Sequence, residues 1–325
     1  MVAPRIGVDL GGTKIHGVVL DPDGRISAET RIATPHGDYT GTLDVLERLV
    51  ASLDGGRKLT VGIGTPGSRL PFSGLMQNCN STWLNGQPLL ADLQARLGAR
   101  VRIANDADCF ALSEASPGGS AAQSRVVFGV ILGTGVGGGI VIDGCGLSGR
   151  NGLGGEWGHT PLPYFRESVA ELPLASRHCY CGRLNCIETF LSGAGLVRTC
   201  RELDARTQGL DSAQAICEAA ATSPEWWYGS GNGKMENNPA VRALALYCRM
   251  LARSLAQIVN VLDPDAIVLG GGLSNASGIY GPVRHWLPDN VFGERCETRI
   301  LAPRWGDASG VRGAAWLWPA DTAKR

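Results

Sequence analysis

Two stretches of this chain share one layout: a strand, a glycine-rich turn, a second strand and an Asp-Gly turn. The first is RIGVDLGGTKIHGVVLDPDGRISAETRIATP, which begins at Arg5, and the second is VVFGVILGTGVGGGIVIDGCG, which begins at Val126. Apolar and β-branched residues bounded by turn residues are typical of strands. Because the layout occurs twice without close identity, we expect a duplicated pair of α/β domains rather than a solenoid.

The composition restricts the class of protein. With 325 residues, 44% hydrophobic content and a mean hydropathy of zero, the chain is long enough for two domains with separate cores. Thirty basic and thirty acidic residues cancel, so nothing favours nucleic acid or an anionic membrane as a partner, and the expected ligand is small. No apolar run approaches the length of about 20 residues that spans a bilayer, and no signal peptide precedes the first strand. We therefore expect a cytoplasmic protein.

Further patterns predict the domain boundary and the longer helices. The small-residue segment SPGGSAAQS predicts a boundary between an N-terminal small domain, residues 1–118, and a C-terminal large domain, residues 119–325. Apolar residues at helical spacing predict helices over Tyr39–Leu53 and Ala240–Leu262. A final helix is expected over residues 309–318, where it could pack on the small domain. The segment Trp226–Lys234 is expected to be a loop or an insertion.

Three cysteines and one histidine have the spacing of a metal site. His159 ends the motif GEWGH, and the motif HCYCGRLNCIE supplies Cys179, Cys181 and Cys186. Three thiolates and one imidazole satisfy a tetrahedral Zn²⁺, and a closed set of this kind is usually structural rather than catalytic. The alternative is a group of unrelated buried thiols, but a Cys-x-Cys-x4-Cys cluster in a glycine-containing loop packs poorly as core. We predict a structural zinc site.

Charged side chains flank this predicted metal site. Glu156 and Glu188 would be held beside it as two hydrogen-bond acceptors, an arrangement that suits a polyol substrate. Arg177 and Arg183 lie next to the cysteines in sequence, and we expect them to help neutralise the anionic thiolates.

Glycines cluster at three predicted strand ends. Glycine lacks a Cβ, so backbone amides at such turns can approach a ligand closely and bind anions. A single glycine turn is more often a plain hairpin, but hydroxyl and charged groups beside the turns favour phosphate binding. Neither of the first two turns fits a Walker or dinucleotide fingerprint. The residues concerned are Asp9, Gly11, Gly12, Thr13 and Lys14 at the first turn, Thr134 and Gly135 at the second, and Gly270 to Gly272 at the third.

Two carboxylates near predicted strand ends are candidates for catalysis. Asp9 ends the first strand and could hold Mg²⁺ through water, since this ion keeps several waters and binds few protein carboxylates. In VRIANDADCFALSEA, a strand is expected to end at Asn105 and a helix to begin at Asp106. Asp106 could be the general base that accepts a hydroxyl proton during phosphoryl transfer. It could equally be an N-cap residue, a position that Asp favours.

The ordered motifs resemble those of one family. The set DLGGTK, GIGTPGS, NDADCFALSEA, GTGVGGG, GEWGH, CYCGRLNCIE and LDPDAIVLGGG resembles the ROK family of sugar kinases, over nearly the whole chain. The stretches NCNSTWLNGQPL and GDASGVRGAAWLWP look most like bacterial fructokinases of the manno(fructo)kinase type.

This resemblance implies a fold and a set of roles. It implies two ribonuclease H-like domains of the actin/hexokinase-like superfamily that close around ATP and a hexose, with Mg²⁺ and a structural Zn²⁺ as cofactors. Asp106 would be the catalytic base, the turns at Gly11 and Gly135 would hold phosphates, and Gly270 and Gly271 would lie by the adenosine. Homodimers are common in such families, and we expect one here. The residues implied to bind the sugar are Asn80, Asn105, Glu156, His159 and Glu188.

Several functions are compatible with the motifs. The first is phosphorylation of fructose to fructose 6-phosphate. An N-acetylglucosamine kinase or a glucose or mannose kinase is the alternative, although Trp83 and Leu84 look bulky for a pocket that admits an N-acetyl group. A sugar-sensing transcriptional repressor is less favoured, because Asp9 comes too early in the chain for a preceding helix-turn-helix segment. A sugar-binding protein without catalysis is less favoured because Asp106, Thr13, Thr134 and all four zinc ligands are present.

Overall fold

The computed structural model describes residues 3–165, 174–204, 207–221 and 238–318. The chain forms two compact units, each assembled from separate segments. Unit 1 comprises Met1–Gly129, Gly139–Gly155 and Pro303–Arg325, and unit 2 comprises Val130–Gly138 and Glu156–Ala302. The expected boundary after residue 118 stays a prediction. The expected insertion at Trp226–Lys234 lies outside the described residues.

Unit 1 contains a mixed five-stranded sheet. Strand β1 pairs antiparallel with β2 and parallel with β4, which in turn pairs parallel with β7. Parallel strands end at the same edge of a sheet, so Asp9, Thr65 and Asn105 are brought to one edge from three distant parts of the chain. The strand order is β3 (Ile26–Ala33), β2 (Lys14–Leu20), β1 (Arg5–Leu10), β4 (Thr60–Thr65) and β7 (Val101–Asn105).

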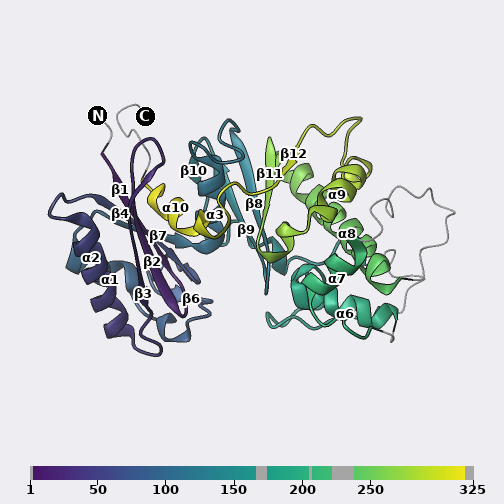
Figure 1. Cartoon of the computed structure of the whole chain (residues 1–325), viewed down its shortest axis with the longest axis horizontal. Helices are drawn as coiled ribbons and strands as arrows, with labels where there is room; N and C mark the ends of the chain where they lie inside the picture. The colour runs from purple at the N-terminus through teal and green to yellow at the C-terminus, as the bar shows by residue number, and fades with distance from the viewer. Residues whose placement is uncertain (1–2, 166–173, 205–206, 222–237, 319–325) are drawn as a thin grey trace. The chain divides into compact units, whose positions relative to one another are not determined.

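Helices cover both faces of this sheet (Figure 1). On one face, α1 (Tyr39–Asp54) and α2 (Leu89–Leu97) share an apolar core with the strands. The side chain of Asp38 accepts a hydrogen bond from the Gly41 amide and so caps α1, and the predicted helix is confirmed. On the other face lie α3 (Asp106–Ala115) and α10 (Ser309–Ala315).

The close approach of α10 to the sheet depends on glycine. A Cβ atom at Gly62 in β4 would overlap the carbonyl oxygen of Ala314, and one at Gly7 in β1 would overlap that of Val311. A Cβ atom at Gly313 would likewise overlap the carbonyl oxygen of Cys109 in α3. These glycines let the backbone of α10 lie directly against two strands and a helix.

We expect Gly62→Ala to lower the free energy of unfolding by about 3 kcal/mol, because an added methyl group must push α10 away from β4. Denaturant unfolding measures this loss. Gly146→Ala is the matched control, since a Cβ there meets only ordinary van der Waals contact, 3.6 Å from Leu112. Equal stability of the two variants would contradict the close packing of α10.

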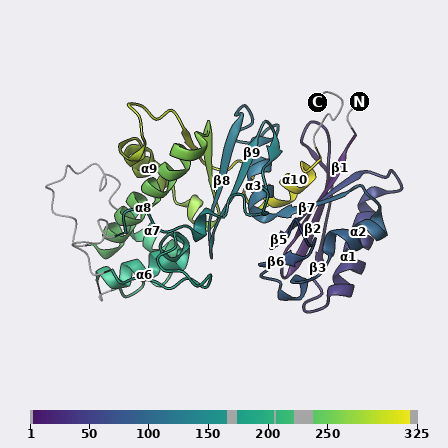
Figure 2. The same cartoon turned by 180° about the vertical axis from the view of Figure 1, so that it is seen from behind.

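The second five-stranded sheet has the order β10 (Cys145–Gly146), β9 (Val136–Ile142), β8 (Val126–Leu132), β11 (Ala266–Gly270) and β12 (Arg299–Leu301). Unit 2 contains its strands β11 and β12 and is otherwise mainly helical. The predicted long helix is confirmed as α8, Pro239–Leu262, which ends where Asp263 adopts a left-handed conformation. Figure 2 shows α6 and α7 beside α8. The described part of unit 2 also contains the α-helices α5 (Glu188–Leu191), α6 (Gly193–Leu203), α7 (Ala213–Ala221) and α9 (Tyr280–Trp286). Two mixed sheets flanked by helices confirm the predicted α/β class.

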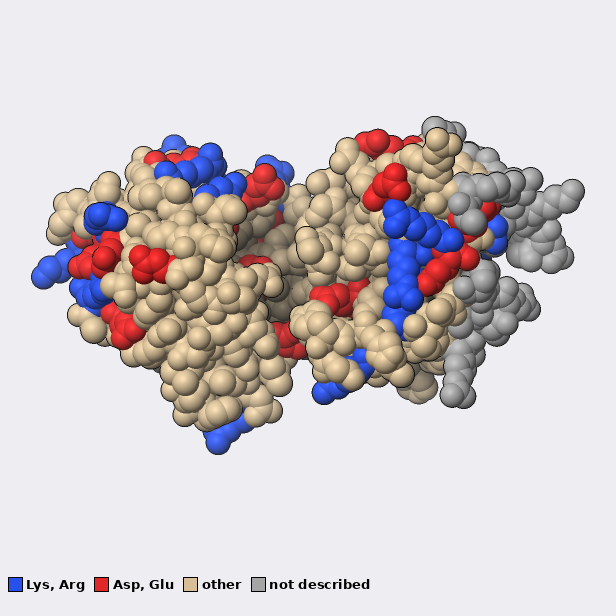
Figure 3. Space-filling view, turned by 90° about the horizontal axis from the view of Figure 1, so that it is seen from below, with Lys and Arg blue, Asp and Glu red and all other residues tan. Residues whose placement is uncertain are grey.

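Unit 1 and unit 2 also contain short strands and 3-10 helices. A hairpin of β5 (Ser68–Arg69) and β6 (Met76–Gln77) precedes the 3-10 helix η1 (Thr82–Leu84) in unit 1, and η2 (Trp157–His159) lies in unit 2. Basic and acidic side chains lie beside one another on the face shown in Figure 3. Among the residues that the structure describes, no helix combines the length and the apolar character needed to cross a membrane.

Candidate active site

A cavity of about 500 Å³ opens at the strand ends of unit 1. It forms where the parallel strands finish, because turns and side chains from five separate sequence segments converge at that edge. The lining includes six residues singled out from the sequence: Asp9, Gly11, Gly12, Thr13, Asn80 and Asp106. The structure therefore brings the first glycine turn and the predicted base to one cavity.

The junction of β7 and α3 assigns different tasks to Asn105 and Asp106. Asn105 is the N-cap residue of α3, and its side-chain oxygen accepts a hydrogen bond from the Asp108 amide at 2.6 Å. Asp106 is the first helical residue, and its carboxylate accepts from the Ala107 amide at 2.9 Å. The interpretation of Asp106 as the N-cap is therefore wrong, because Asn105 holds that position. Asp106 is left to face the cavity, and the sugar contact expected of Asn105 stays a prediction.

Burial makes the two cavity carboxyl groups harder to ionise. Loss of solvent, reinforced by the nearby charge of Asp106, raises the pKa of Asp9 to about 6, against a smaller opposing effect of Lys14. Desolvation also raises the pKa of Asp106, although the Ala107 hydrogen bond opposes this. Asp108, two residues further along α3, lines a different cavity. A carboxylate with a raised pKa is a better proton acceptor than an exposed one.

These shifts predict a pH dependence. A general base acts in its ionised form, so activity is lost as the pH falls through the raised pKa. We expect the acidic limb of kcat/KM for the sugar to lie well above the ordinary aspartate pKa of about 3.9. The measurement is kcat/KM against pH at constant ionic strength. A rate that stays flat down to pH about 4 would contradict a desolvated carboxylate as the base.

The first glycine turn is held by backbone contacts. The Gly11 amide donates to the Lys14 carbonyl at 3.1 Å, and the Thr34 hydroxyl donates to the Gly11 carbonyl at 2.8 Å. Gly12, Thr13 and Lys14 are exposed. The hydrogen bonds of Gly11 therefore fix the backbone of the turn, while its exposed residues remain accessible to an anion.

A second cavity, of about 1180 Å³, lies within unit 2. It is lined by Gly133 and Thr134 of the second glycine turn and by Gly272, which follows β11. Gly271 has φ +79°, and a Cβ atom there would meet backbone atoms of Leu132 at 2.5 Å. The second and third predicted turns thus contribute to one cavity, although Gly272 lines it rather than Gly270 or Gly271.

Glu188 supports the second turn. Its carboxylate accepts a hydrogen bond from the Val136 amide at 3.0 Å, and a Cβ atom at Gly135 would lie 2.5 Å from the same oxygen. Gly135 therefore leaves room for this carboxylate. Since Glu188 follows Cys186 closely in sequence, it links the metal loop to the turn, a contact that sequence reasoning missed.

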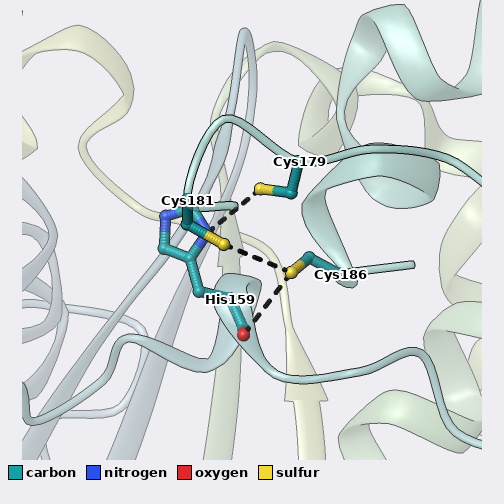
Figure 4. A group of neighbouring side chains, drawn as sticks. All are labelled: His159, Cys179, Cys181 and Cys186. Carbon is teal, nitrogen blue, oxygen red and sulfur yellow. Dashed lines mark hydrogen bonds between the residues drawn. The ribbon is translucent and has the colours of Figure 1, made fainter. Parts of the chain in front are cut away.

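The predicted metal ligands lie together. The ligand atoms of His159, Cys179, Cys181 and Cys186 are all within 4.8 Å of one another (Figure 4). His159 Nδ1 lies 3.5 Å from the Cys179 sulfur, and the sulfurs of Cys181 and Cys186 are 3.6 Å apart. In a tetrahedral site with Zn–S bonds of about 2.3 Å, the sulfurs are separated by about 3.8 Å. The four residues can hold a metal ion, and the donor set fits zinc.

Neighbours of the metal loop differ from expectation. His159 Nε2 lies 2.9 Å from the hydroxyl of Tyr180, which leaves Nδ1 to face the sulfurs. Arg177 does not neutralise the thiolates. Its buried guanidinium donates to the carbonyl oxygens of Thr189 and Gly195 and pairs with Glu202 at 2.8 Å, because these acceptors surround it in the interior. Arg177 thereby ties the metal loop to the helices α5 and α6.

Two aromatic residues of unit 1 line its cavity, and sequence reasoning had considered only one of them, Trp83, as a pocket residue. His36 and Trp83 both face it, with ring centroids 4.8 Å apart. Leu84, which looked bulky for the pocket, is instead fully buried in the core shared with α1 and α2. Of that pair, only Trp83 lines the cavity.

Comparison with known proteins identifies the chain's relatives. The ROK family profile matches residues 5–321. The chain belongs to the ROK family. An N-acetyl-D-glucosamine kinase of Salmonella paratyphi B is 38% identical over 317 residues, which cover 97% of this chain and 99% of that protein. As a member with such relatives, the chain is a ROK sugar kinase.

Solved structures of the family agree with the fold. A ROK family glucokinase from Streptomyces griseus, in complex with glucose and AMPPNP, is 28% identical with a TM-score of 0.71 and covers 97% of this chain and 99% of its own. The ROK hexokinase from Thermus thermophilus is 25% identical with a TM-score of 0.78 and covers 97% of each chain. The predicted actin-like fold is confirmed. The fructokinase prediction gains no support from these relatives, and the N-acetylglucosamine alternative is better supported.

Proposed function

We propose that this protein transfers the γ-phosphoryl group of ATP to the 6-hydroxyl group of N-acetyl-D-glucosamine. The observation that carries the proposal is the 38% identity with N-acetyl-D-glucosamine kinases over nearly the full length of both proteins. The cavity that joins Asp106 to the first glycine turn supports it, since phosphoryl transfer needs a proton acceptor next to a phosphate site.

The residues of unit 1 would act as follows. Asp106 accepts the proton of the 6-hydroxyl group as its oxygen attacks phosphorus, and Asn80 holds a second hydroxyl group. The amides of Gly11 and Gly12 and the Thr13 hydroxyl group bind phosphate oxygens, with Lys14 nearby as a positive charge. Asp9 would hold Mg²⁺ through water, and the ion neutralises phosphate charge when bound. Catalysis then rests on positioning and charge stabilisation.

The residues of unit 2 would bind the nucleotide and shape the sugar contacts. Thr134 and Gly135 contact phosphate, and the adenosine occupies the cavity that Gly272 lines, near Gly270 and Gly271. Glu156 and Glu188 bind sugar hydroxyl groups, as the resemblance implies. His159 does so as well when its Nε2 exchanges the Tyr180 hydroxyl group for a sugar hydroxyl group. A structural zinc on His159 and the three cysteines would fix the loop that carries them. The protein would act as a homodimer.

A coupled assay of ADP formation tests the substrate. We expect kcat/KM for N-acetylglucosamine to exceed that for glucose, mannose and fructose by at least about tenfold, the discrimination that one well-fitted group can provide. A higher value for fructose would restore the fructokinase interpretation and reject ours. If none of the four sugars supports ADP formation, the result would favour a sugar-binding protein without kinase activity.

A further inference from the structure

The unit 1 cavity follows the edge of the sheet where the strands end. Asp106 directly follows β7, the strand at one side of the sheet. His36 follows β3, the strand at the other side, which ends at the same edge because two antiparallel pairings separate it from β1. Both residues line the cavity. The base and His36 therefore lie toward opposite ends of it.

Trp83 is fixed at the His36 end. Its indole N–H donates to the hydroxyl group of Thr42 at 3.3 Å, and Thr42 is fully buried in α1. The polar edge of the indole is thus satisfied inside the protein, and the ring packs against the core of unit 1. What remains toward the cavity is apolar ring surface, which suits a methyl group.

His36 offers the complementary polar group. Its ring is exposed and contacts Trp83 at 4.8 Å with an interplanar angle of 57°. Within the described ranges of the chain, no hydrogen bond to the His36 side chain is found. An imidazole N–H beside an apolar ring can bind a carbonyl group that carries a methyl group.

The chemistry of the sugar connects these two ends. In a pyranose ring, C2 lies directly across from C5, the atom that bears the 6-hydroxymethyl group. A sugar with its 6-hydroxyl group at Asp106 therefore directs its C2 substituent away from the base. We propose that His36 and Trp83 form the acetamido-binding end of the cavity: Trp83 packs on the methyl group and His36 donates to the carbonyl oxygen.

This inference rests on the proposed function, and its test uses sugars that differ only at C2. The assay compares kcat/KM for N-acetylglucosamine and glucose in the wild type and in Trp83→Ala, Trp83→Phe and His36→Ala. We expect the ratio of the two values to fall about tenfold in Trp83→Ala and severalfold in His36→Ala, with smaller losses for Trp83→Phe. His36→Gln, which keeps an N–H donor, should retain most of the ratio.

A gain of function separates recognition from damage to the fold. Trp83→Ala should leave space for a longer acyl chain, so N-butyrylglucosamine should improve as a substrate relative to N-acetylglucosamine by about tenfold. A misfolded variant cannot show such a gain. Phe72→Ala is the control, since this aromatic side chain of the same unit is 83% exposed and does not line the cavity.

The proposed substrate and the proposed acetamido site would be contradicted by different results. If the wild type phosphorylates N-acetylglucosamine no better than glucose, the proposed substrate is wrong and the acetamido site falls with it. If the wild type prefers N-acetylglucosamine but the Trp83 and His36 variants change both sugars equally, the substrate stands and only the acetamido site is overturned.

Discussion

Asp106→Asn should lower kcat for sugar phosphorylation by about a thousandfold, within the range expected for loss of a general base. The amide keeps an oxygen that can accept the hydrogen bond now made by the Ala107 amide at 2.9 Å, so the start of α3 should be retained. What the variant loses is the ability to take up a proton. Steady-state kinetics at saturating ATP measure the effect.

Asp108→Asn is the matched control for this prediction. It removes the same charge from the first turn of the same helix, but Asp108 lines a different cavity. We expect activity within about threefold of the wild type, because the residue does not face the proposed site. If Asp106→Asn keeps kcat near the wild-type value while its unfolding midpoint is unchanged, another group must accept the proton.

Cys181→Ser should abolish zinc binding and destabilise the protein by roughly 5 kcal/mol, because three remaining ligands hold the ion far less well. Cys181 is exposed, so its replacement disturbs little packing and isolates the effect of the metal. The loss should be smaller than the roughly 10–16 kcal/mol of a zinc finger, since Arg177 already ties the loop to its helices. Metal analysis and denaturant unfolding measure the two quantities.

Cys145→Ser provides the comparison, because Cys145 is also exposed but lies outside the cluster. It should keep a full zinc content and wild-type stability. A chelator should then destabilise the wild type and Cys145→Ser but leave Cys181→Ser unchanged. Wild-type protein that contains no zinc when purified in zinc-supplemented buffer would show that the four side chains are a cluster of thiols and not a metal site.

Local patterns were sufficient for much of this protein. The spacing of Leu43, Val45, Leu46, Leu49 and Val50 predicted α1, because apolar residues on one helical face must be buried. The metal ligands could also be named in advance, because the three cysteines lie within eight consecutive residues and few alternatives suit such a cluster. The glycine turns could be predicted for the same reason, because clustered glycines mark places where the backbone can approach a ligand or another segment closely.

The errors arose where the sequence places candidate residues next to one another and only the tertiary structure decides what each side chain contacts. Asn105 and Asp106 are adjacent and both suit a helix N-terminus, and only the direction of β7 decides which one caps α3 and which faces the cavity. Arg177 looked like a neighbour of the thiolates in sequence. The backbone instead sends its side chain to Thr189, Gly195 and Glu202.

The sequence by itself determined the α/β class, the two glycine-turn layouts and the metal-ligand set, because each depends on residues that lie close together along the chain. Only the tertiary structure decided that His36 and Trp83 share a cavity with Asp106, and that Leu84 does not. Those residues come from three segments that meet only when the parallel strands end at one edge of the sheet. Their proximity is a property of strand pairing, which no local pattern records.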